Sequence, residues 1–382
     1  MLSQKEIFSK AGLVIVSILL SLFIAELILR FLYPEQTKYF VWQPNLQHTF
    51  YPDSNILHGL NGASQFSINS QGFRGDEFEN DSRQKYICLG GSTTECLYLD
   101  DNETWQHQLQ LLMGSRTALP PAIGSIGKSG CTTREHYLQL KYYVPQIGKI
   151  DGVMLMVGLN DMMKRLSHDT LFEDNFQLTQ QVEDSLVNTI FLSNKKENVW
   201  WRKTNLFQFA QNILHRTKKV EWQNVQDDEG KIYKTWRANR QRTAVVLYSL
   251  PDLSSALNEY ERNLQLIYEE TQKQGIKLIV VNQSALYKDT MSVYENNLLW
   301  MGGVGNFQEE RGHAYYSSKA LRKGLQLYNG RLQQFCSDKH YIKFVNLATS
   351  LPCDTSVFYD DCHFNESGAK KVAGIIAEQI IR

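Results

Sequence analysis

The sequence has little that would indicate a metal site or a nucleic-acid partner. Its six cysteines form no CxxC pair and show no spacing with histidine that would hold a structural zinc ion. Its 40 basic residues balance 40 acidic ones, and no basic DNA-binding motif is present. No internal repeat or low-complexity tract stands out in the 382 residues. We therefore expect one large or two smaller globular domains, with no metal, cofactor or nucleic-acid partner.

Charge is also absent from one stretch near the amino terminus. Residues 11–25 carry no charge, and the apolar run continues to Tyr33, just before Pro34. A helix of about 23 residues is long enough to cross a hydrocarbon core of roughly 30 Å. Glu26 and Arg30 are four residues apart and could pair on one face of this helix. No A-x-A-like cleavage site is present, so a signal anchor is favoured over a cleaved signal peptide or a buried core helix.

The predicted domain plan has four parts. Residues 1–10 form a cytoplasmic stub, 11–33 the transmembrane anchor, 34–84 a juxtamembrane linker and loops, and 85–382 the main domain. Lysines and arginines are nearly balanced across the span, so they do not decide the orientation. The simplest plan is a short stub inside and a large exported domain. We therefore expect a single-pass protein of the cell membrane, with this domain on the periplasmic or extracytoplasmic side.

Beyond residue 84, short apolar runs alternate with segments of helical periodicity. Apolar runs bounded by Gly, Pro or polar residues are typical of strands that are buried on both faces. Their alternation with helices predicts a mostly parallel sheet covered on both sides, with its site at the carboxyl ends of the strands. The predicted strands are Lys85–Leu89, Ala122–Ile126, Gly152–Val157, Ile276–Asn282 and Ile342–Leu347. The predicted helices are Thr104–Met113, Arg134–Tyr143, Ala256–Gln274, Ser317–Ser337 and Glu366–Ile381.

Residues 188–245 interrupt this alternation, and we interpret them as an insertion. They hold four tryptophans, and from Lys195 to Arg242 twelve basic residues stand against five acidic ones. Indole rings stack on sugars and also lie at membrane interfaces, while surplus positive charge suits anionic lipid or acidic polysaccharide. Trp200 and Trp201 are therefore candidates for substrate binding. The alternative is that the tryptophans pack a small subdomain and the charges are solvated.

Polar residues suited to catalysis follow three successive predicted strands. Gly90-Gly91 and Ser92 follow the first, Gly130 follows the second, and Asn160 follows the third. A serine nucleophile needs donors for the oxyanion, and the Gly130 N–H and the Asn160 amide could supply them. Each residue alone has a plainer reading, because serine and asparagine cap helices and glycine forms turns.

A candidate base precedes the last predicted helix, in the segment DDCHFNESG. Asp360 stands three residues before His363, a spacing at which a carboxylate in a tight turn can reach Nδ1 of the imidazole. Asp361 is the rival orienting group but is less well placed. The alternative is that both carboxylates are solvated and His363 has no role.

In order, the four blocks GGST, GKSG, GLND and DDCH resemble those of the SGNH hydrolases, also called GDSL esterases and lipases. The segments FSINSQGFRGDEF and YERNLQLIYEETQKQGIKLIVV resemble the membrane-anchored bacterial members. The resemblance covers roughly residue 66 to the end. GGST departs from the more usual GDSL, and Ser125 stands where the Gly block often has Asn, which we expect to loosen the hydrogen bonding around the site. The insertion has no counterpart that we can place.

This resemblance implies a three-layer α/β/α flavodoxin-like fold with a five-stranded sheet, and ester hydrolysis through an acyl-enzyme. It implies that Ser92 is the nucleophile, His363 the base and Asp360 the group that orients it. The implied oxyanion donors are the N–H groups of Ser92 and Gly130 and the amide of Asn160. Thr93 is a further candidate for substrate binding.

The expected substrate is an O-acyl ester, with acetyl as one candidate acyl group, on an envelope polysaccharide or lipid. Two alternatives stay open. An O-acyltransferase would use the same site, and a non-catalytic glycan-binding or scaffold subunit would use none of it. If the domain is exported, the pairs Cys353–Cys362 and Cys96–Cys131 could form disulfides. The sequence does not show which protein partners share the membrane with it.

Overall fold

The computed structural model describes residues 4–32, 38–117, 119–168, 177–192, 204–207, 219–222 and 227–381. The chain divides into two compact units. The first comprises Met1–Tyr39 and Ser193–Lys219, and the second comprises Phe40–Leu192 and Val220–Arg382.

The first unit is built on the helix α1 (Gln4–Leu32), which begins inside the predicted stub. Within it, Gly12–Phe31 is long and apolar enough to cross a membrane, with a mean hydropathy of 2.7 and no burial inside the protein. Glu26 pairs with Arg30 at 2.8 Å, as predicted from their spacing. The Glu26 carboxylate also accepts hydrogen bonds from the backbone N–H groups of Asn205 (3.1 Å) and Leu206 (2.9 Å). Part of the predicted insertion therefore contacts the end of this helix.

The second unit contains a five-stranded sheet in the order β10-β8-β5-β3-β4, and every pair of neighbouring strands is parallel. This is the flavodoxin-like order, so the predicted fold class is confirmed. The strands β3, β4 and β5 are buried along their whole length because they consist mainly of apolar residues and glycine. The bounds are β3 Lys85–Gly90, β4 Ala122–Ser125, β5 Gly152–Val157, β8 Lys277–Asn282 and β10 Ile342–Val345.

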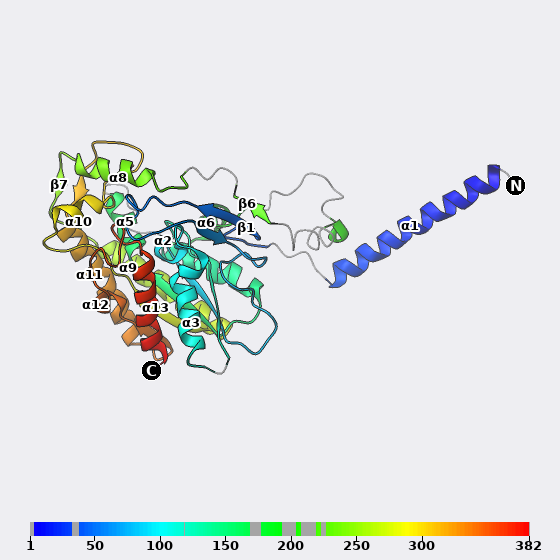
Figure 1. Ribbon diagram of the computed structural model, residues 1–382. Helices are drawn as coiled ribbons and strands as arrows, with labels where there is room; N and C mark the ends of the chain where they lie inside the picture. Colours follow the sequence, from blue (N-terminus) through cyan, green and yellow to red (C-terminus); the bar gives the residue numbers. More distant parts are fainter. Residues whose placement is uncertain are drawn as a thin grey trace. The chain divides into compact units, whose positions relative to one another are not determined.

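Helices cover both faces of this sheet. On one face, α3 (Trp105–Gly114) packs against α13 (Glu366–Ile381), and the two lie side by side in Figure 1. On the other face, α9 contacts α4, α5 and α11. The bounds of these four are α4 Thr133–Leu138, α5 Leu159–Ser167, α9 Ser254–Gln274 and α11 Ser318–Ser337. All five predicted helices are present, although the one predicted at 134–143 changes to a π-helical turn after Leu138.

The segment predicted as a linker and loops, residues 34–84, contains two strands instead. β1 (Leu46–Phe50) pairs with β2 (Ser64–Ser67) in antiparallel register, and β6 (Val220–Glu221) pairs with β1 in parallel. The prediction missed them because they are short and carry mostly polar residues. Aromatic packing holds them: the ring of Trp42 lies 5.2 Å from that of Phe66 and 5.4 Å from that of Trp222.

The predicted insertion does not form one subdomain. Ser193–Lys219 belongs to the first unit, whereas its other parts belong to the second. Within the second unit, α8 (Ile232–Gln241) places Trp236 against Trp300, with ring centroids 4.5 Å apart. The remaining elements are α2 Ser92–Glu95, η1 Asp101–Glu103, η3 Val144–Ile147, α6 Gln180–Ile190, β7 Val246–Leu247, α10 Val293–Leu298, β9 Tyr315–Tyr316 and α12 Leu347–Ser350.

Candidate active site

Ser92 is the first residue of α2, directly after the carboxyl end of β3. The two glycines before it are required by close packing. A Cβ atom at Gly90 would lie 2.1 Å from Thr94 Oγ1, and one at Gly91 would lie 2.2 Å from Asn160 Nδ2. Only glycine allows the chain to turn here with the Thr94 and Asn160 side chains this close.

Ser92, His363 and Asp360 form a continuous chain of hydrogen bonds. His363 Nε2 lies 2.7 Å from Ser92 Oγ, and His363 Nδ1 lies 2.6 Å from Asp360 Oδ2. Because an ionised carboxylate only accepts, Nδ1 carries a proton, and in the neutral imidazole that acts as a base Nε2 accepts from the serine hydroxyl. His363 and Asp360 are buried, whereas Ser92 is partly exposed. A serine, its base and an orienting group thus have the geometry of a catalytic triad.

The Asp360 carboxylate is held by further donors. Trp300 Nε1 donates to Oδ2 at 2.8 Å, and the backbone N–H groups of Cys362 and His363 donate to Oδ1 at 2.9 and 2.8 Å. Burial acts to raise the pKa of Asp360, but the charge of His363 and these hydrogen bonds outweigh it and lower the pKa. Asp360 is therefore ionised at neutral pH.

Asp361, the rival orienting group, faces another partner set. It accepts hydrogen bonds from the Tyr287 hydroxyl (3.0 Å) and from the backbone N–H groups of Trp300 (2.7 Å) and Met301 (3.2 Å). Burial, followed by the charge of Asp360, raises its pKa to about 6. Asp361 thus fixes the backbone at Trp300, whose indole N–H in turn contacts Asp360.

Aromatic rings enclose the His363 imidazole. Tyr359 and Trp300 lie nearly parallel to it, with centroids at 5.6 and 6.5 Å, and Tyr233 lies edge-on at 6.3 Å. Burial acts to lower the pKa of His363, but the charge of Asp360 dominates the opposing effects, and the pKa is raised well above 6.5. The packing leaves the ring little freedom to rotate away from Ser92.

The Gly and Asn blocks adjoin the Ser block. The backbone N–H of Lys128 donates to the Gly90 carbonyl at 3.0 Å, and Asn160 Nδ2 donates to the Cys131 carbonyl at 2.8 Å. Gly130 lies between them in an exposed turn at φ +78°, where glycine is favoured. The structure therefore brings Ser92, Gly130 and Asn160 to the same edge of the sheet.

Two buried polar side chains hold the Gly block in place, and the first of them, Glu95, was not predicted from the sequence. Glu95, one turn after Ser92, accepts hydrogen bonds from the backbone N–H (2.7 Å) and the hydroxyl of Ser129. Burial raises the pKa of Glu95, and the bonds from Ser129 oppose this. Ser125 Oγ donates to the Thr94 carbonyl at 3.2 Å and accepts from Gly127 N at 3.3 Å. The expected loosening at Ser125 is therefore not seen in its hydrogen bonds.

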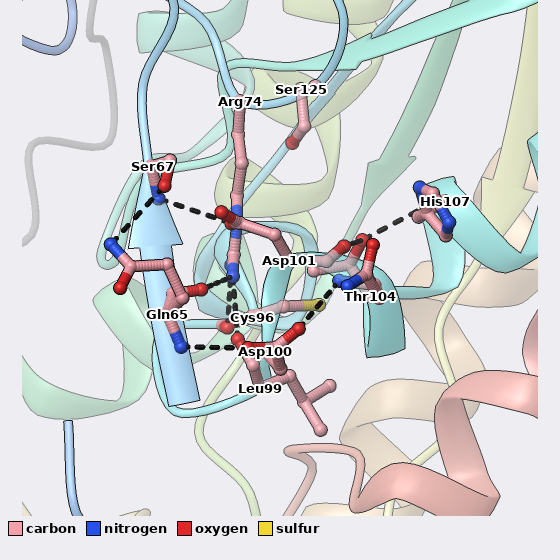
Figure 2. Close-up of polar contacts among 12 residues, drawn as sticks. Gln65, Ser67, Arg74, Cys96, Leu99, Asp100, Asp101, Thr104, His107 and Ser125 are labelled. Carbon is pink, nitrogen blue, oxygen red and sulfur yellow. Dashed lines mark hydrogen bonds and ion pairs between the residues drawn. The ribbon is translucent and has the colours of Figure 1, made fainter. Parts of the chain in front are cut away.

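Arg74 was also missed, and it braces the segment that follows α2. Its guanidinium donates to the carbonyls of Cys96 (2.9 Å) and Leu99 (2.6 Å) and to the Asp101 carboxylate (2.7 Å), as Figure 2 shows. Asp100 and Asp101 in turn accept from backbone N–H groups of β2. The motif FRGDEF contains this arginine, so the resemblance could have singled it out.

The three substrate-binding candidates have different outcomes. The Thr93 side chain is buried, and its Oγ1 accepts from Gln283 Nε2 at 3.0 Å and lies 3.6 Å from Met156 Sδ. It therefore ties α2 to the neighbouring strands. Trp200 and Trp201 lie outside the residues that the structure describes.

A small cavity adjoins Ser92 and His363. Its volume is about 10 Å³, and its apolar walls include Tyr98, Leu99 and Phe364. This is the space of roughly one water molecule. A larger cavity of about 820 Å³ lies between residues 248–257 and the start of α11, and no residue of the triad lines it.

Asp360, Cys362 and His363 form the one potential metal-ligand cluster among the described residues, with ligand atoms within 4.8 Å of one another. Their chemistry does not favour a metal site. The His363 and Asp360 atoms are already bonded to each other, and burial raises the pKa of the Cys362 thiol to about 11. A thiol that stays protonated is a poor metal ligand.

The predicted disulfides are absent, because all six cysteines are free thiols. Cys362 Sγ lies 3.8 Å from Met301 Sδ, and Cys353 Sγ lies 3.6 Å from Ser284 Oγ. Cys96 Sγ contacts the Thr93 carbonyl at 3.4 Å. The pairing hypothesis is therefore wrong.

Comparison with known proteins finds no matching family model and no matching curated sequence. Among solved structures, a catalytic mutant of Axe2, an acetylxylan esterase from Geobacillus stearothermophilus, is 13% identical, covers 79% of this chain and 96% of its own, and has a TM-score of 0.42. A G-D-S-L lipolytic family protein from Veillonella parvula is 12% identical, covers 78% of this chain and 99% of its own, and has a TM-score of 0.40. A protein of the same family from Desulfitobacterium hafniense is 10% identical, covers 78% of this chain and 99% of its own, and has a TM-score of 0.39. Likeness at this level carries no functional conclusion.

Proposed function

We propose that this chain is a serine esterase of the SGNH type, which hydrolyses an O-acyl ester through an acyl-enzyme. The observation that carries this proposal is the pair of hydrogen bonds that joins Ser92 Oγ to His363 at 2.7 Å and His363 to Asp360 at 2.6 Å. Ser92 alone of the three is partly open to solvent, as a nucleophile must be.

In the first half-reaction, Ser92 Oγ attacks the ester carbonyl carbon while its proton passes to His363 Nε2. The imidazolium then gives that proton to the departing alcohol oxygen, and the ester bond breaks. In the second half-reaction, water loses a proton to His363 and attacks the acyl-enzyme, which releases the acid and restores Ser92. Asp360 stays ionised throughout and stabilises the imidazolium.

The negative charge on the carbonyl oxygen needs donors that are already in place. The N–H groups of Ser92 and Gly130 and the Nδ2 of Asn160 are the candidates on this edge of the sheet. Ser92 also begins a helix, where unpaired N–H groups favour negative charge. Removal of one such donor typically costs about 10²–10³ in rate.

The small cavity beside Ser92 supports a short acyl group, with acetyl preferred. A space of about 10 Å³ admits little beyond a methyl group unless Tyr98 or Leu99 moves. The apolar helix α1 and the positive, Trp-bearing insertion support a substrate at a membrane surface, either an acylated envelope glycan or a lipid. In this proposal α1 anchors the chain and the catalytic unit lies on the extracytoplasmic side.

The test uses the full-length protein in detergent. Hydrolysis of p-nitrophenyl acetate and butyrate is followed for the wild type, Ser92→Ala and His363→Ala. We expect faster turnover of acetate than butyrate, and loss of both activities in each variant. Unchanged turnover in Ser92→Ala would refute the assignment.

The same samples separate the alternatives. Covalent labelling of Ser92 by a fluorophosphonate probe without hydrolysis, together with acyl transfer to an added sugar, would identify an acyltransferase. Neither labelling nor turnover would favour the non-catalytic glycan-binding or scaffold subunit.

A further inference from the structure

Three buried polar atoms belong to residues that line a second small cavity, beside the start of α5. They are Asp161 Oδ2, Tyr260 OH and Tyr328 OH, and none has a hydrogen-bond partner within the part of the chain that the structure describes. All three residues line one cavity of about 10 Å³. A buried polar atom left unbonded costs about 1–3 kcal/mol. Three such atoms at one cavity therefore point to an occupant that bonds to them.

The rest of the Asp161 carboxylate is already satisfied. Its Oδ1 accepts hydrogen bonds from the backbone N–H (3.1 Å) and the hydroxyl (2.6 Å) of Thr133. Burial raises the pKa of Asp161 to about 6, and the bonds from Thr133 oppose this. A ligand that donates a hydrogen bond to Oδ2 would complete the carboxylate and favour its ionised form.

Size and charge identify the ligand. The volume suits one water molecule, which typically makes about three hydrogen bonds in such a site. Arg134 and Glu259 also line the cavity but pair with each other, which leaves the charge of Lys164 to disfavour a metal cation and that of Asp161 to disfavour an anion. We infer that the cavity binds a single structural water molecule, which donates to Asp161 Oδ2 and accepts from the hydroxyls of Tyr260 and Tyr328.

This water site lies next to the candidate oxyanion donors. Asp161 directly follows Asn160, and Tyr260 OH lies 3.3 Å from where a Cβ atom of Gly158 would stand. Thr133, bonded to Asp161, is two residues after Cys131, whose carbonyl accepts the Asn160 amide. The water thus joins the starts of α4 and α5 to α9 and α11. Tyr260 and Tyr328 are then positioning residues for Asn160, a role that rests on the proposed esterase function.

A crystal structure of the full-length protein in detergent tests the water itself. We expect one ordered water within hydrogen-bond distance of all three oxygens, and its loss in the double variant Tyr260→Phe/Tyr328→Phe. An empty cavity in the wild type would overturn the inference, as would a metal or halide identified by its anomalous signal. This readout stands even if the protein hydrolyses no ester.

Kinetics with p-nitrophenyl acetate test the positioning role. We expect kcat of the double variant to fall about 10-fold, a fraction of the loss of a whole oxyanion donor, with KM within about twofold of the wild type. The matched control is Tyr143→Phe, a buried tyrosine outside the cavity whose hydroxyl donates to the Gln71 carbonyl at 2.8 Å. Tyr328→Phe alone replaces the double variant if that does not fold. A kcat equal to that of the control would refute the positioning role, whereas an inactive wild type would refute the proposed function alone.

Discussion

Substitution of Gly91 by alanine offers a sharp test of the oxyanion donors, because it acts on Asn160 without touching the triad. The Cβ atom would lie 2.2 Å from Asn160 Nδ2 and 3.2 Å from its Cγ. The backbone of Gly91, at φ −78° and ψ −151°, is extended and lies outside the positive-φ region that favours glycine. The effect must therefore come from displacement of the Asn160 amide, and we expect kcat to fall about 10²–10³-fold.

A double-mutant cycle with Asn160→Ala separates this mechanism from general disruption. Asn160→Ala alone removes the donor and should cost a similar factor of about 10²–10³. Once the amide is gone, the nearest remaining atom to the new methyl group is the Cys131 carbonyl oxygen at 3.6 Å, an ordinary contact. The double variant should therefore resemble either single variant, with a coupling free energy of about 2.7–4 kcal/mol.

The assay is p-nitrophenyl acetate hydrolysis at saturating substrate, with urea unfolding to follow stability. Gly275→Ala is the control, because it strains a glycine at φ +68° that has nothing within 4 Å of the added Cβ. It should lower the free energy of unfolding by about 1–2 kcal/mol and leave kcat unchanged. A kcat within threefold of wild type for Gly91→Ala, or fully additive losses in the double variant, would refute the reasoning.

Substitutions at three further positions test other parts of the site. Asp360→Asn should lower kcat about 10⁴-fold and move the acid limb of the residual kcat/KM profile to lower pH, since Asp360 raises the pKa of His363. In the wild type, the raised pKa of His363 stabilises the fold fully below pH 6.5, the pKa of histidine in the unfolded chain, and this stabilisation is lost as the pH rises through the folded-state pKa. Urea unfolding of Asp360→Asn at a series of pH values should therefore not show this loss of stability at higher pH. Glu95→Ala removes the hydrogen bonds that hold Ser129 and should lower kcat about 10-fold, whereas Glu95→Gln, which can still accept from Ser129, should retain most of the wild-type kcat. Equal losses of kcat in the two variants would exclude the hydrogen-bonding role. Tyr98→Ala should open the cavity and raise the ratio of butyrate to acetate turnover about 10-fold, whereas Tyr98→Phe should leave this ratio unchanged. An unchanged ratio in Tyr98→Ala would show that the cavity does not receive the acyl group.

The central sheet could be predicted from the sequence because its strands are buried on both faces. Such strands are continuous apolar runs, and Gly152–Val157 was predicted with its observed bounds. The helix α13 was also predicted with its observed bounds, because its apolar positions recur at helical spacing. Short strands with polar residues gave no comparable signal. The pairing of β1 with β2 and β6 depends on aromatic contacts between residues as distant in sequence as Trp42 and Trp222.

The candidate site divides in the same way. Ser92, Gly130, Asn160 and His363 follow strand ends or precede a helix, so local sequence and the family resemblance could locate them. Two of the residues that support them, Glu95 and Trp300, could not be found in this way. No local pattern distinguishes Glu95 from other polar helix residues. Its contact with Ser129 forms only because the ends of β3 and β4 lie side by side in the folded sheet. Trp300 lies 60 residues from Asp360, and no local pattern indicates that its indole contacts that carboxylate.

The adjacent carboxylates of Asp360 and Asp361 show how the fold separates two identical groups. Both are fully buried, so burial acts to raise both pKa values. Asp360 lies beside the charge of His363 and accepts four hydrogen bonds, two of them from His363, and together these lower its pKa. Asp361 faces no imidazole and carries the added repulsion of Asp360, so its pKa rises to about 6. Trp300 connects the two carboxylates, because its backbone N–H donates to Asp361 and its indole N–H donates to Asp360. Asp361→Asn should therefore act on the triad through the position of this indole, and its loss of kcat should be much smaller than that of Asp360→Asn.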